Sequence, residues 1–317
     1  MFYDRLITMR KKLLLIFLLC LPHLLGHAAD IRVYDLRVEN LTNPLGLDVS
    51  SPRFSWKISS DKKNTLQTAY EIIVASSQEL LSQDKGDLWE SGLVSSRQQL
   101  WVTYQGKRLS DNQHAYWKVR IRSNKGMSQW SEAQTFSIGL LGETHWKGRW
   151  IGLESLQPGD CQGMHTRLAA RYLRNEFMAK DSIKRATAFV AAFGLYDFYI
   201  NGHLIGEGEA LRPVPADFRK TVYYNTYDVT RALNSGRNAL AIVLEAGRVF
   251  PPRQEKPYKT PYFGLPKCRI NVIVEYADGS QTTWATDQQW KLTTDGPVRS
   301  ANEYDGEEYD ARRMLKT

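Results

Sequence analysis

The pair Asn201-Gly202, which stands between two apolar runs, constrains the fold more than any other feature of the sequence. Apolar residues alternate with a period of two over Tyr196–Ile200, and a second apolar run, Leu204-Ile205, follows the pair. A type I′ turn needs positive φ at both central residues, and Asn-Gly adopts such angles at little cost. The sequence therefore predicts a β-hairpin here, and with it an antiparallel sheet.

Short runs rich in β-branched and aromatic residues, bounded by turn-forming residues, recur along the whole chain. Helical periodicity is nearly absent, apart from Ser77–Gln83 and a short stretch at Asp228–Leu233. The sequence therefore predicts an all-β protein. The expected strands are Ile31–Val38, Arg53–Ile58, Ala69–Ala75, Leu100–Tyr104, Tyr116–Ser123, Ala133–Ile138, Ala170–Met178, Thr187–Gly194, Tyr196–Ile200, Val222–Asp228, Ala239–Glu245, Cys268–Glu275, Thr282–Ala285 and Lys291–Thr294.

These strands fall into two groups, separated by the aromatic, Gly-containing linker Trp146–Gly152. We expect two consecutive β-sandwich domains: a fibronectin-III/Ig-like sandwich over residues 30–141 and a jelly-roll sandwich of carbohydrate-binding type over 149–317. Within Trp117–Arg122 apolar and basic residues alternate strictly, which predicts one buried and one wet face.

Residues 1–28 have the pattern of a secretory signal peptide. The basic segment Met9–Lys12 precedes the apolar run Leu13–Leu25, which is too short to span a bilayer. Gly26–Ala28 then supplies small residues before a cleavage site. We therefore expect a secreted or periplasmic protein with no membrane span. A lipoprotein is not favoured, because Cys20 follows a leucine where a small residue is needed.

Residues 1–28 hold +3 of the net charge of +8 at pH 7, so the mature chain would carry about +5. Lys and Arg are dispersed among Asp and Glu, whereas nucleic-acid binding requires a basic stripe or a recognised motif. The sequence predicts no nucleic-acid partner.

Two cysteines, Cys161 and Cys268, remain after the predicted signal peptide is removed. Export would permit a disulfide between them, but spacing alone does not decide between a bond and two thiols. The histidines of the mature chain are scattered singly, without metal-ligand spacing. The sequence thus predicts no metal site and no cofactor.

Four segments, LYDFYINGHLIGEG, YYNTYDVT, GRNALAIVLEAGR and GPVRSANEYDGEEYDAR, resemble the N-terminal β-sandwich module of bacterial α-L-rhamnosidases. Residues 31–141 resemble the fibronectin-type module that precedes it in those enzymes. The resemblance implies a secreted glycoside hydrolase that removes terminal L-rhamnose from plant glycans by an inverting, two-carboxylate mechanism. It also implies that both carboxylates belong to a C-terminal α/α-barrel, which this sequence lacks.

We therefore expect the non-catalytic N-terminal part of such an enzyme, inactive by itself. One alternative is a stand-alone carbohydrate-binding module for rhamnosides. The other is a structural brace produced by a truncated gene or a designed fragment.

Two regions of the second domain are candidate carbohydrate-binding surfaces. One is the face around Asp217 and Tyr223–Asn225; the other is the Pro-rich stretch Val249–Pro266, which could equally be a stiff cover. Aromatic rings offer flat faces to sugars, and Arg offers paired donors. The resemblance implies that some equivalent modules bind rhamnose with calcium, but no calcium ligand is assigned here. The candidates are Asp217, Tyr223, Tyr224, Asn225, Arg248, Phe250, Tyr258 and Tyr262.

The acidic stretch Glu303–Asp310 resembles a glycosidase carboxylate pair only superficially. Asp305 and Glu307 would lie about 7 Å apart on an extended strand, within the range of inverting enzymes. An exposed strand, however, lacks the walls that raise one carboxyl pKa and exclude water. We therefore predict no catalytic residues here. The stretch and the linker tryptophans are predicted to dock neighbouring domains, although the linker rings could instead stack on a sugar. The docking candidates are Trp146, Trp150, Glu303, Asp305, Glu307, Asp310 and Arg312.

Overall fold

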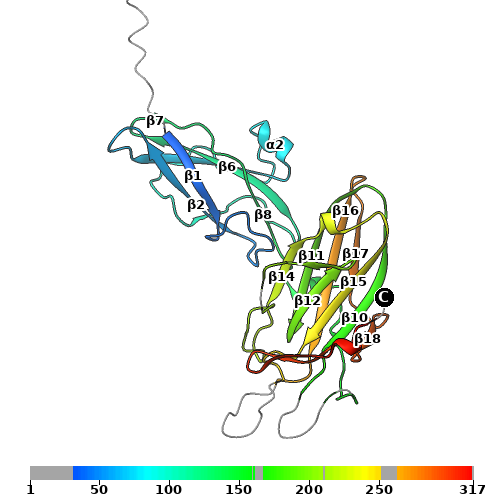
Figure 1. Ribbon diagram of the computed structural model, residues 1–317. Helices are drawn as coiled ribbons and strands as arrows, with labels where there is room; N and C mark the ends of the chain where they lie inside the picture. Colours follow the sequence, from blue (N-terminus) through cyan, green and yellow to red (C-terminus); the bar gives the residue numbers. More distant parts are fainter. Residues whose placement is uncertain (1–30, 159, 161–166, 210, 251–262, 316–317) are drawn as a thin grey trace, which may run out of the picture. The chain divides into compact units, whose positions relative to one another are not determined.

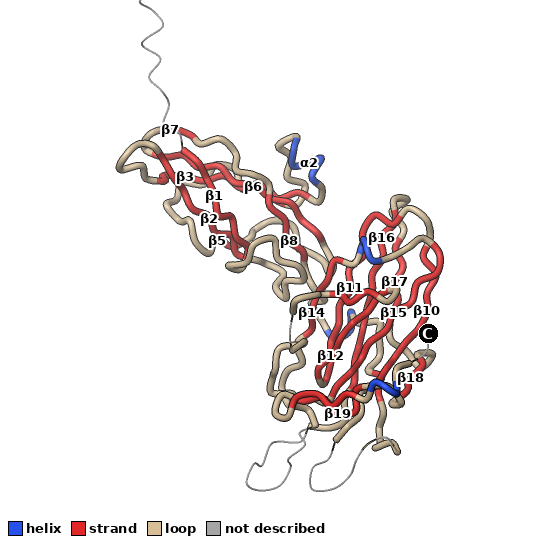
Figure 2. The backbone as a smooth tube through the Cα atoms, viewed as in Figure 1, coloured by secondary structure: helices blue, strands red, loops and turns tan. Residues whose placement is uncertain are grey.

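The computed structural model describes residues 31–158, 160, 167–209, 211–250 and 263–315. Within these ranges nearly every element is a strand, and the single α-helix is the short α2 (Gln78–Ser82) (Figures 1 and 2). The all-β prediction is confirmed. The described chain forms two compact units, the first comprising residues 31–43, 51–107 and 115–135, and the second the remainder. The predicted signal peptide lies outside the described residues.

The first unit is a sandwich of two antiparallel sheets, in the orders β1-β2-β5 and β4-β3-β6-β7, with β8 also paired to β6. Side chains from both sheets meet in its core: the rings of Phe54 and Trp117 lie 4.5 Å apart, and both are fully buried. The strands are β1 (Ile31–Val38), β2 (Arg53–Ser60), β3 (Gln67–Ala75), β4 (Trp89–Glu90), β5 (Val102–Thr103), β6 (His114–Ser123), β7 (Gly126–Met127) and β8 (Gln134–Ser137).

A bulge in β1 changes which residues of that strand face the core. The register with β2 shifts between Tyr34 and Arg37, and Asp35 has a φ of 49°. An extra residue in one strand reverses the alternation beyond it. The buried residues are accordingly Ile31 and Val33 before the bulge and Leu36 and Val38 after it.

Strand β6 buries one face as its alternation predicts, since Trp117, Val119 and Ile121 are all 0% exposed. The prediction that the other face is wet is wrong at Lys118, which is also buried. Its Nζ donates to the Leu81 carbonyl at 2.7 Å and pairs with the Asp84 carboxylate. Helix α2 and the residues after it therefore supply a partner that sequence periodicity cannot reveal.

The second unit is a larger sandwich of two five-stranded antiparallel sheets. One has the order β13-β12-β15-β10-β18; the other has the order β14-β11-β16-β17, with β9 paired to β16. Their facing apolar side chains form one core cluster, which includes Phe198 and Ile242 from the first sheet and Val190 and Ile270 from the second. The strands are β9 (Ile151–Gly152), β10 (Arg171–Ala179), β11 (Ile183–Phe193), β12 (Leu195–Ile200), β13 (His203–Ile205), β14 (Tyr224–Asp228), β15 (Gly236–Glu245), β16 (Lys267–Tyr276), β17 (Gln281–Ala285) and β18 (Lys291–Thr293).

The predicted hairpin is confirmed between β12 and β13. Asn201 and Gly202 have φ angles of 50° and 82°, as a type I′ turn requires. The Asn201 side chain also ties the turn to β15, because its Oδ1 accepts the Ala239 amide at 2.9 Å and its Nδ2 donates to Asn238 Oδ1 at 2.9 Å. The helix expected over Asp228–Leu233 is only a 3₁₀ turn, η3 (Thr230–Ala232).

A fully buried ion pair joins the segment before β10 to that strand. The side chains of Arg171 and Asp160 are 1% and 0% exposed, and Arg171 Nη2 lies 2.7 Å from Asp160 Oδ2. Asp160 also accepts the backbone amides of Ala169 at 3.0 Å and Gln157 at 2.9 Å. The carboxylate thereby stabilises both the loop backbone and the strand.

A two-stranded sheet follows the sandwich, formed by β19 (Val298–Asn302) and β20 (Gly306–Tyr309). Val298 and Ala301 of β19 pack with Tyr172 and Val243, which lie on β10 and β15. Every residue of β20 is exposed. The hairpin therefore has one strand held against the sandwich and one open to solvent.

Candidate carbohydrate-binding site

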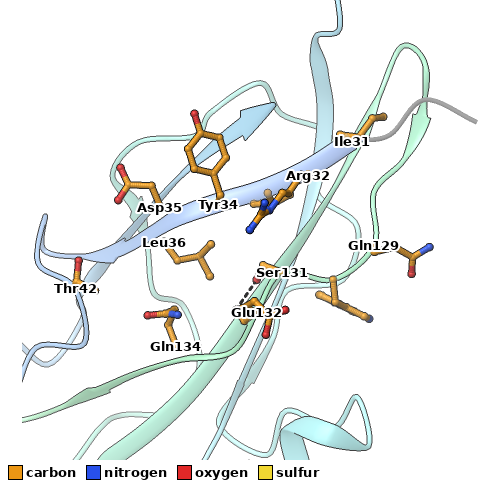
Figure 3. Close-up of a pocket in the computed structure, with 12 residues that line it drawn as sticks. Ile31, Arg32, Tyr34, Asp35, Leu36, Thr42, Gln129, Ser131, Glu132 and Gln134 are labelled. Atoms are coloured by element: carbon orange, nitrogen blue, oxygen red, sulfur yellow. Dashed lines mark hydrogen bonds between the residues drawn. The ribbon is translucent and has the colours of Figure 1, made fainter. Parts of the chain in front are cut away.

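Both units contain an open pocket large enough for a small ligand. That of the first unit, about 420 Å³, lies between β1 and Gln129–Gln134. Figure 3 shows Leu36 pointing toward Gln134, whereas the ring of Tyr34 points away. The ring of Trp130 is already covered by cations, with the Arg120 guanidinium 4.4 Å from its centroid. This pocket therefore offers little free aromatic surface to a sugar.

The pocket of the second unit, about 480 Å³, is more aromatic. It lies beside the end of β11 and the start of β16, and it is lined by Trp150, Glu154, Phe193, Val222, Phe263, Gly264, Leu265 and Lys267. Its volume is in the range typical of small-molecule sites. We take this pocket as the candidate binding site.

The aromatic wall of this pocket is held in place by edge-on ring contacts. The rings of Phe193 and Phe218 lie 5.0 Å apart at 65°, and those of Phe218 and Phe263 lie 5.6 Å apart at 70°. Such contacts fix ring orientation through their quadrupoles. Trp150, on the same pocket, keeps 40% of its surface exposed. Its ring is thus available to pack against the C–H face of a sugar.

The charged groups that line the pocket are Lys267 and Glu154, whose Nζ and Oε1 atoms lie 2.8 Å apart. The strand registers place Lys267 opposite Phe193 on one side and Gly152 on the other. A Cβ at Gly152 would lie 2.6 Å from the Pro266 carbonyl oxygen and 3.0 Å from Lys267 Cγ. The glycine thus leaves room for the lysine stem at the pocket.

The candidate residues Asp217, Tyr223, Tyr224 and Asn225 are not gathered on one face. Asp217 is paired with Arg219 at 2.9 Å, which lowers the pKa of its carboxyl, and Tyr223 is 51% exposed. Neighbours in a strand point to opposite sides, and β14 follows this rule.

On one side of β14, the Tyr224 hydroxyl accepts the Leu140 amide at 3.1 Å, and its ring lies 5.5 Å from that of Trp146. On the other side, Asn225 Oδ1 accepts the Tyr196 hydroxyl at 3.1 Å. Burial and the hydrogen-bonded Tyr227 hydroxyl raise the pKa of Tyr196. Tyr224 and Asn225 therefore both make structural contacts within the second unit.

The candidates in and near the Pro-rich stretch are also separated. Arg248 Nε donates to Glu303 Oε2 at 2.8 Å, so these two predicted residues pair with each other. Phe250 is 7% exposed and packs in a small apolar cluster with Leu168 and Ala246. Tyr258 and Tyr262 lie outside the described residues.

The residues predicted to dock other domains have varied surroundings. Trp146 packs with Leu140 and Phe189, and the Arg269 guanidinium lies 5.2 Å from its ring. Asp305 donates its amide to Asn302 Oδ1 at 2.9 Å, and Glu307 lies on the exposed β20. Arg312 Nε donates to Asp310 at 2.8 Å, and this hydrogen bond lowers the pKa of Asp310 to about 2.

Two half-buried groups outside the pocket have strongly shifted pKa values. Burial, reinforced by the charges of Asp197 and Glu307, raises the pKa of Glu245 to about 7. Burial and the positive charge of Arg185 lower the pKa of His114 to about 4. Cys268 is fully buried in the core, and burial raises the pKa of its thiol. The question of a bond to Cys161 concerns a residue outside the described ranges.

Sequence reasoning missed Phe193, Glu154 and Lys267 as pocket residues, whereas Phe263 belongs to the candidate stretch Val249–Pro266. An aromatic residue followed by glycine, in Phe193-Gly194 and Phe263-Gly264, is the signal that could have pointed to the wall. Among the described residues, no three His, Cys, Asp or Glu side chains are placed to hold a metal ion together.

Two regions of the chain match models of known domain families. Residues 33–142 match the model described as a Rha78A-like, N-terminal immunoglobulin domain. Residues 181–317 match that described as the alpha-L-rhamnosidase N-terminal domain. The two matched regions are N-terminal domains of the α-L-rhamnosidase family.

Individual proteins that match most of this chain are also α-L-rhamnosidases. An α-L-rhamnosidase of Formosa agariphila is 34% identical, with 86% of this chain and 31% of that protein covered. One from Alteromonas sp. is 35% identical, with 86% and 30% covered. The structure of the α-L-rhamnosidase from Dictyoglumus thermophilum matches with a TM-score of 0.80 at 37% identity, covering 90% of this chain and 32% of that one. The chain thus spans about a third of the length of these relatives. No helix among the described residues is long and apolar enough to cross a membrane.

Proposed function

We propose that this chain is the non-catalytic N-terminal part of an α-L-rhamnosidase, and that its second unit holds rhamnose-containing glycans. The observation that carries the binding role is the aromatic pocket with the exposed ring of Trp150. Stacking on such rings, with a few hydrogen bonds, suffices for weak sugar binding in the absence of a catalytic domain.

The absence of hydrolysis by this chain is part of the proposal. Inverting cleavage needs one protonated and one ionised carboxyl held across a walled pocket. The dense acidic stretch includes Glu307 on the exposed strand β20, and Glu303 is already paired with Arg248. The catalytic carboxylates would then belong to a C-terminal domain, toward which the exposed β20 face would dock.

A paired experiment tests both parts. The purified chain is assayed on an aryl α-L-rhamnoside and titrated calorimetrically with L-rhamnose and a rhamnose-containing oligosaccharide, with and without calcium. We expect binding without turnover, and loss of binding in Trp150→Ala. Turnover that disappears in Glu307→Gln would refute the non-catalytic role. Absence of binding by the wild-type chain would leave the structural brace as the better description.

Secretion or a periplasmic location forms a second part of the proposal, which rests on the signal-peptide pattern of residues 1–28. An exported glycan-binding chain would meet its ligands outside the cell. The stand-alone binding module remains the alternative function, and the two differ in whether a catalytic domain follows in the same protein. Reading the gene beyond the codon for residue 317 distinguishes them.

A further inference from the structure

The pocket of the second unit contains an ion pair whose two members are held very differently. The Glu154 side chain is 83% exposed, whereas that of Lys267 is 33% exposed. Lys267 belongs to β16 and is fixed by pairing with both β11 and β9. Glu154 follows the two-residue strand β9 and lies in no strand. The carboxylate can therefore swing away while the ammonium stays in the pocket.

Separating this pair costs little. Exposed ion pairs contribute only about 0–1 kcal/mol, because water screens them and holding two long side chains costs entropy. Once Glu154 has moved, the remaining lining is aromatic and aliphatic around one cation. The pocket then has an unpaired positive charge beside flat apolar surfaces.

We propose that the ligand of this pocket is an anionic sugar, a hexuronate unit of a glycan, whose carboxylate replaces Glu154 on Lys267. A hexuronate combines the two chemistries that the pocket offers. Its ring C–H faces pack on Trp150 and Phe263, and its carboxylate accepts a charge-assisted hydrogen bond from the ammonium. This inference rests on the proposed glycan-binding function and specifies the class of sugar.

A neutral sugar would instead form hydrogen bonds with both members of the Lys267–Glu154 pair. Its hydroxyls would donate to Glu154 and accept from Lys267, so both charged residues would contribute to its affinity. For an anionic sugar, Glu154 competes with the ligand and weakens binding. The effect of removing Glu154 therefore has opposite signs for the two ligand classes.

Calorimetric titration of the whole chain decides between them. The probes are a methyl hexuronide and the corresponding neutral methyl hexoside, each titrated into wild type, Glu154→Gln and Lys267→Met. Glu176→Gln is the matched control, because Glu176 forms an ion pair with Arg237 away from the pocket. Circular dichroism confirms that each variant is folded.

We expect the wild-type chain to bind the hexuronide at least fivefold more tightly than the neutral hexoside, with an affinity that falls as salt is added. Glu154→Gln should bind the hexuronide several-fold more tightly, and Lys267→Met about tenfold more weakly. Glu176→Gln should match the wild type.

Equal affinities for the two probes, or weaker hexuronide binding in Glu154→Gln, would overturn the inference. Neutral-sugar binding that depends on Trp150 would in that case leave the proposed function intact. Absence of binding to every sugar would refute both this inference and the proposed glycan-binding role of the second unit.

Discussion

The buried pair between Asp160 and Arg171 provides a sharp test of the energetics of the second unit. Replacing Asp160 with Asn preserves its size but removes the negative charge that faces a guanidinium only 1% exposed. Breaking a buried ion pair costs about 3–5 kcal/mol, since the remaining charge is left without compensation. We expect a cost toward the upper end, because Arg171 Nε already has no hydrogen-bond partner among the described residues.

The expected shift in melting temperature follows from this cost. A unit of this size loses about 2–4 °C per kcal/mol, so the transition of the second unit should fall by roughly 6–20 °C in differential scanning calorimetry. The exposed pair between Asp217 and Arg219 supplies the control, and Asp217→Asn should leave the midpoint unchanged. The double variant Asp160→Asn, Arg171→Met should recover much of the loss, because it removes the uncompensated guanidinium and keeps a side-chain oxygen as an acceptor for the loop amides of Gln157 and Ala169. A fall of less than about 3 °C in Asp160→Asn would contradict the reasoning.

Four further outcomes are expected. The pKa of Glu245 in the folded chain, about 7, lies above its ordinary value of 4.5, so the free energy of unfolding should fall as the pH rises from 4.5 to 7. The loss should be about 3 kcal/mol at pH 8. Urea titrations of Glu245→Gln should show that this loss is removed. The pKa of His114, about 4 against an ordinary 6.5, acts in the opposite direction, so His114→Gln should remove a loss of similar size as pH falls through that window. Gly202→Val should destabilise the chain by about 1–2 kcal/mol through its φ of 82° alone, since a Cβ there has open space; an unchanged denaturation midpoint would contradict this. Intact-mass measurement of exported protein should show an N-terminus at Ala29 or Asp30, and retention of residues 1–28 would exclude cleavage.

Local patterns in the sequence predict the strands well because their causes are local. Ile31–Val38 is predicted and observed with identical bounds, and the Asn201-Gly202 turn has the required angles. The turn that joins β16 to β17 has the same local cause, since Asp278-Gly279 supplies the glycine, at a φ of 81°, that it requires. Turn chemistry and period-2 alternation fix these features without long-range information.

The pocket could not be predicted in the same way, because its walls come from segments distant in the sequence. Phe193 and Lys267 become neighbours only through the register of β11 with β16. The predicted site instead relied on adjacency, grouping Tyr224 with Asn225, although adjacent strand residues face opposite sides. Burial of Lys118 has a similar cause, since its partners follow from where α2 packs. Alternation identifies the two faces of a strand but not what covers each of them.

The two sides of β14 make different contacts, and this limits how the length of the loop before it can vary. Tyr224 and Thr226 occupy one side, where a Cβ on Gly46 would lie 2.1 Å from Thr226 Oγ1, and Asn225 and Tyr227 occupy the other. Slipping the strand by one residue would exchange these sets, placing an amide where a phenol ring packs. Natural variation in length just before β14 should therefore be absorbed within the loop or occur in steps of two residues. The register of this single strand therefore decides which side chains face the core of the sandwich and which contact Leu140 and Trp146 on the other side of the sheet.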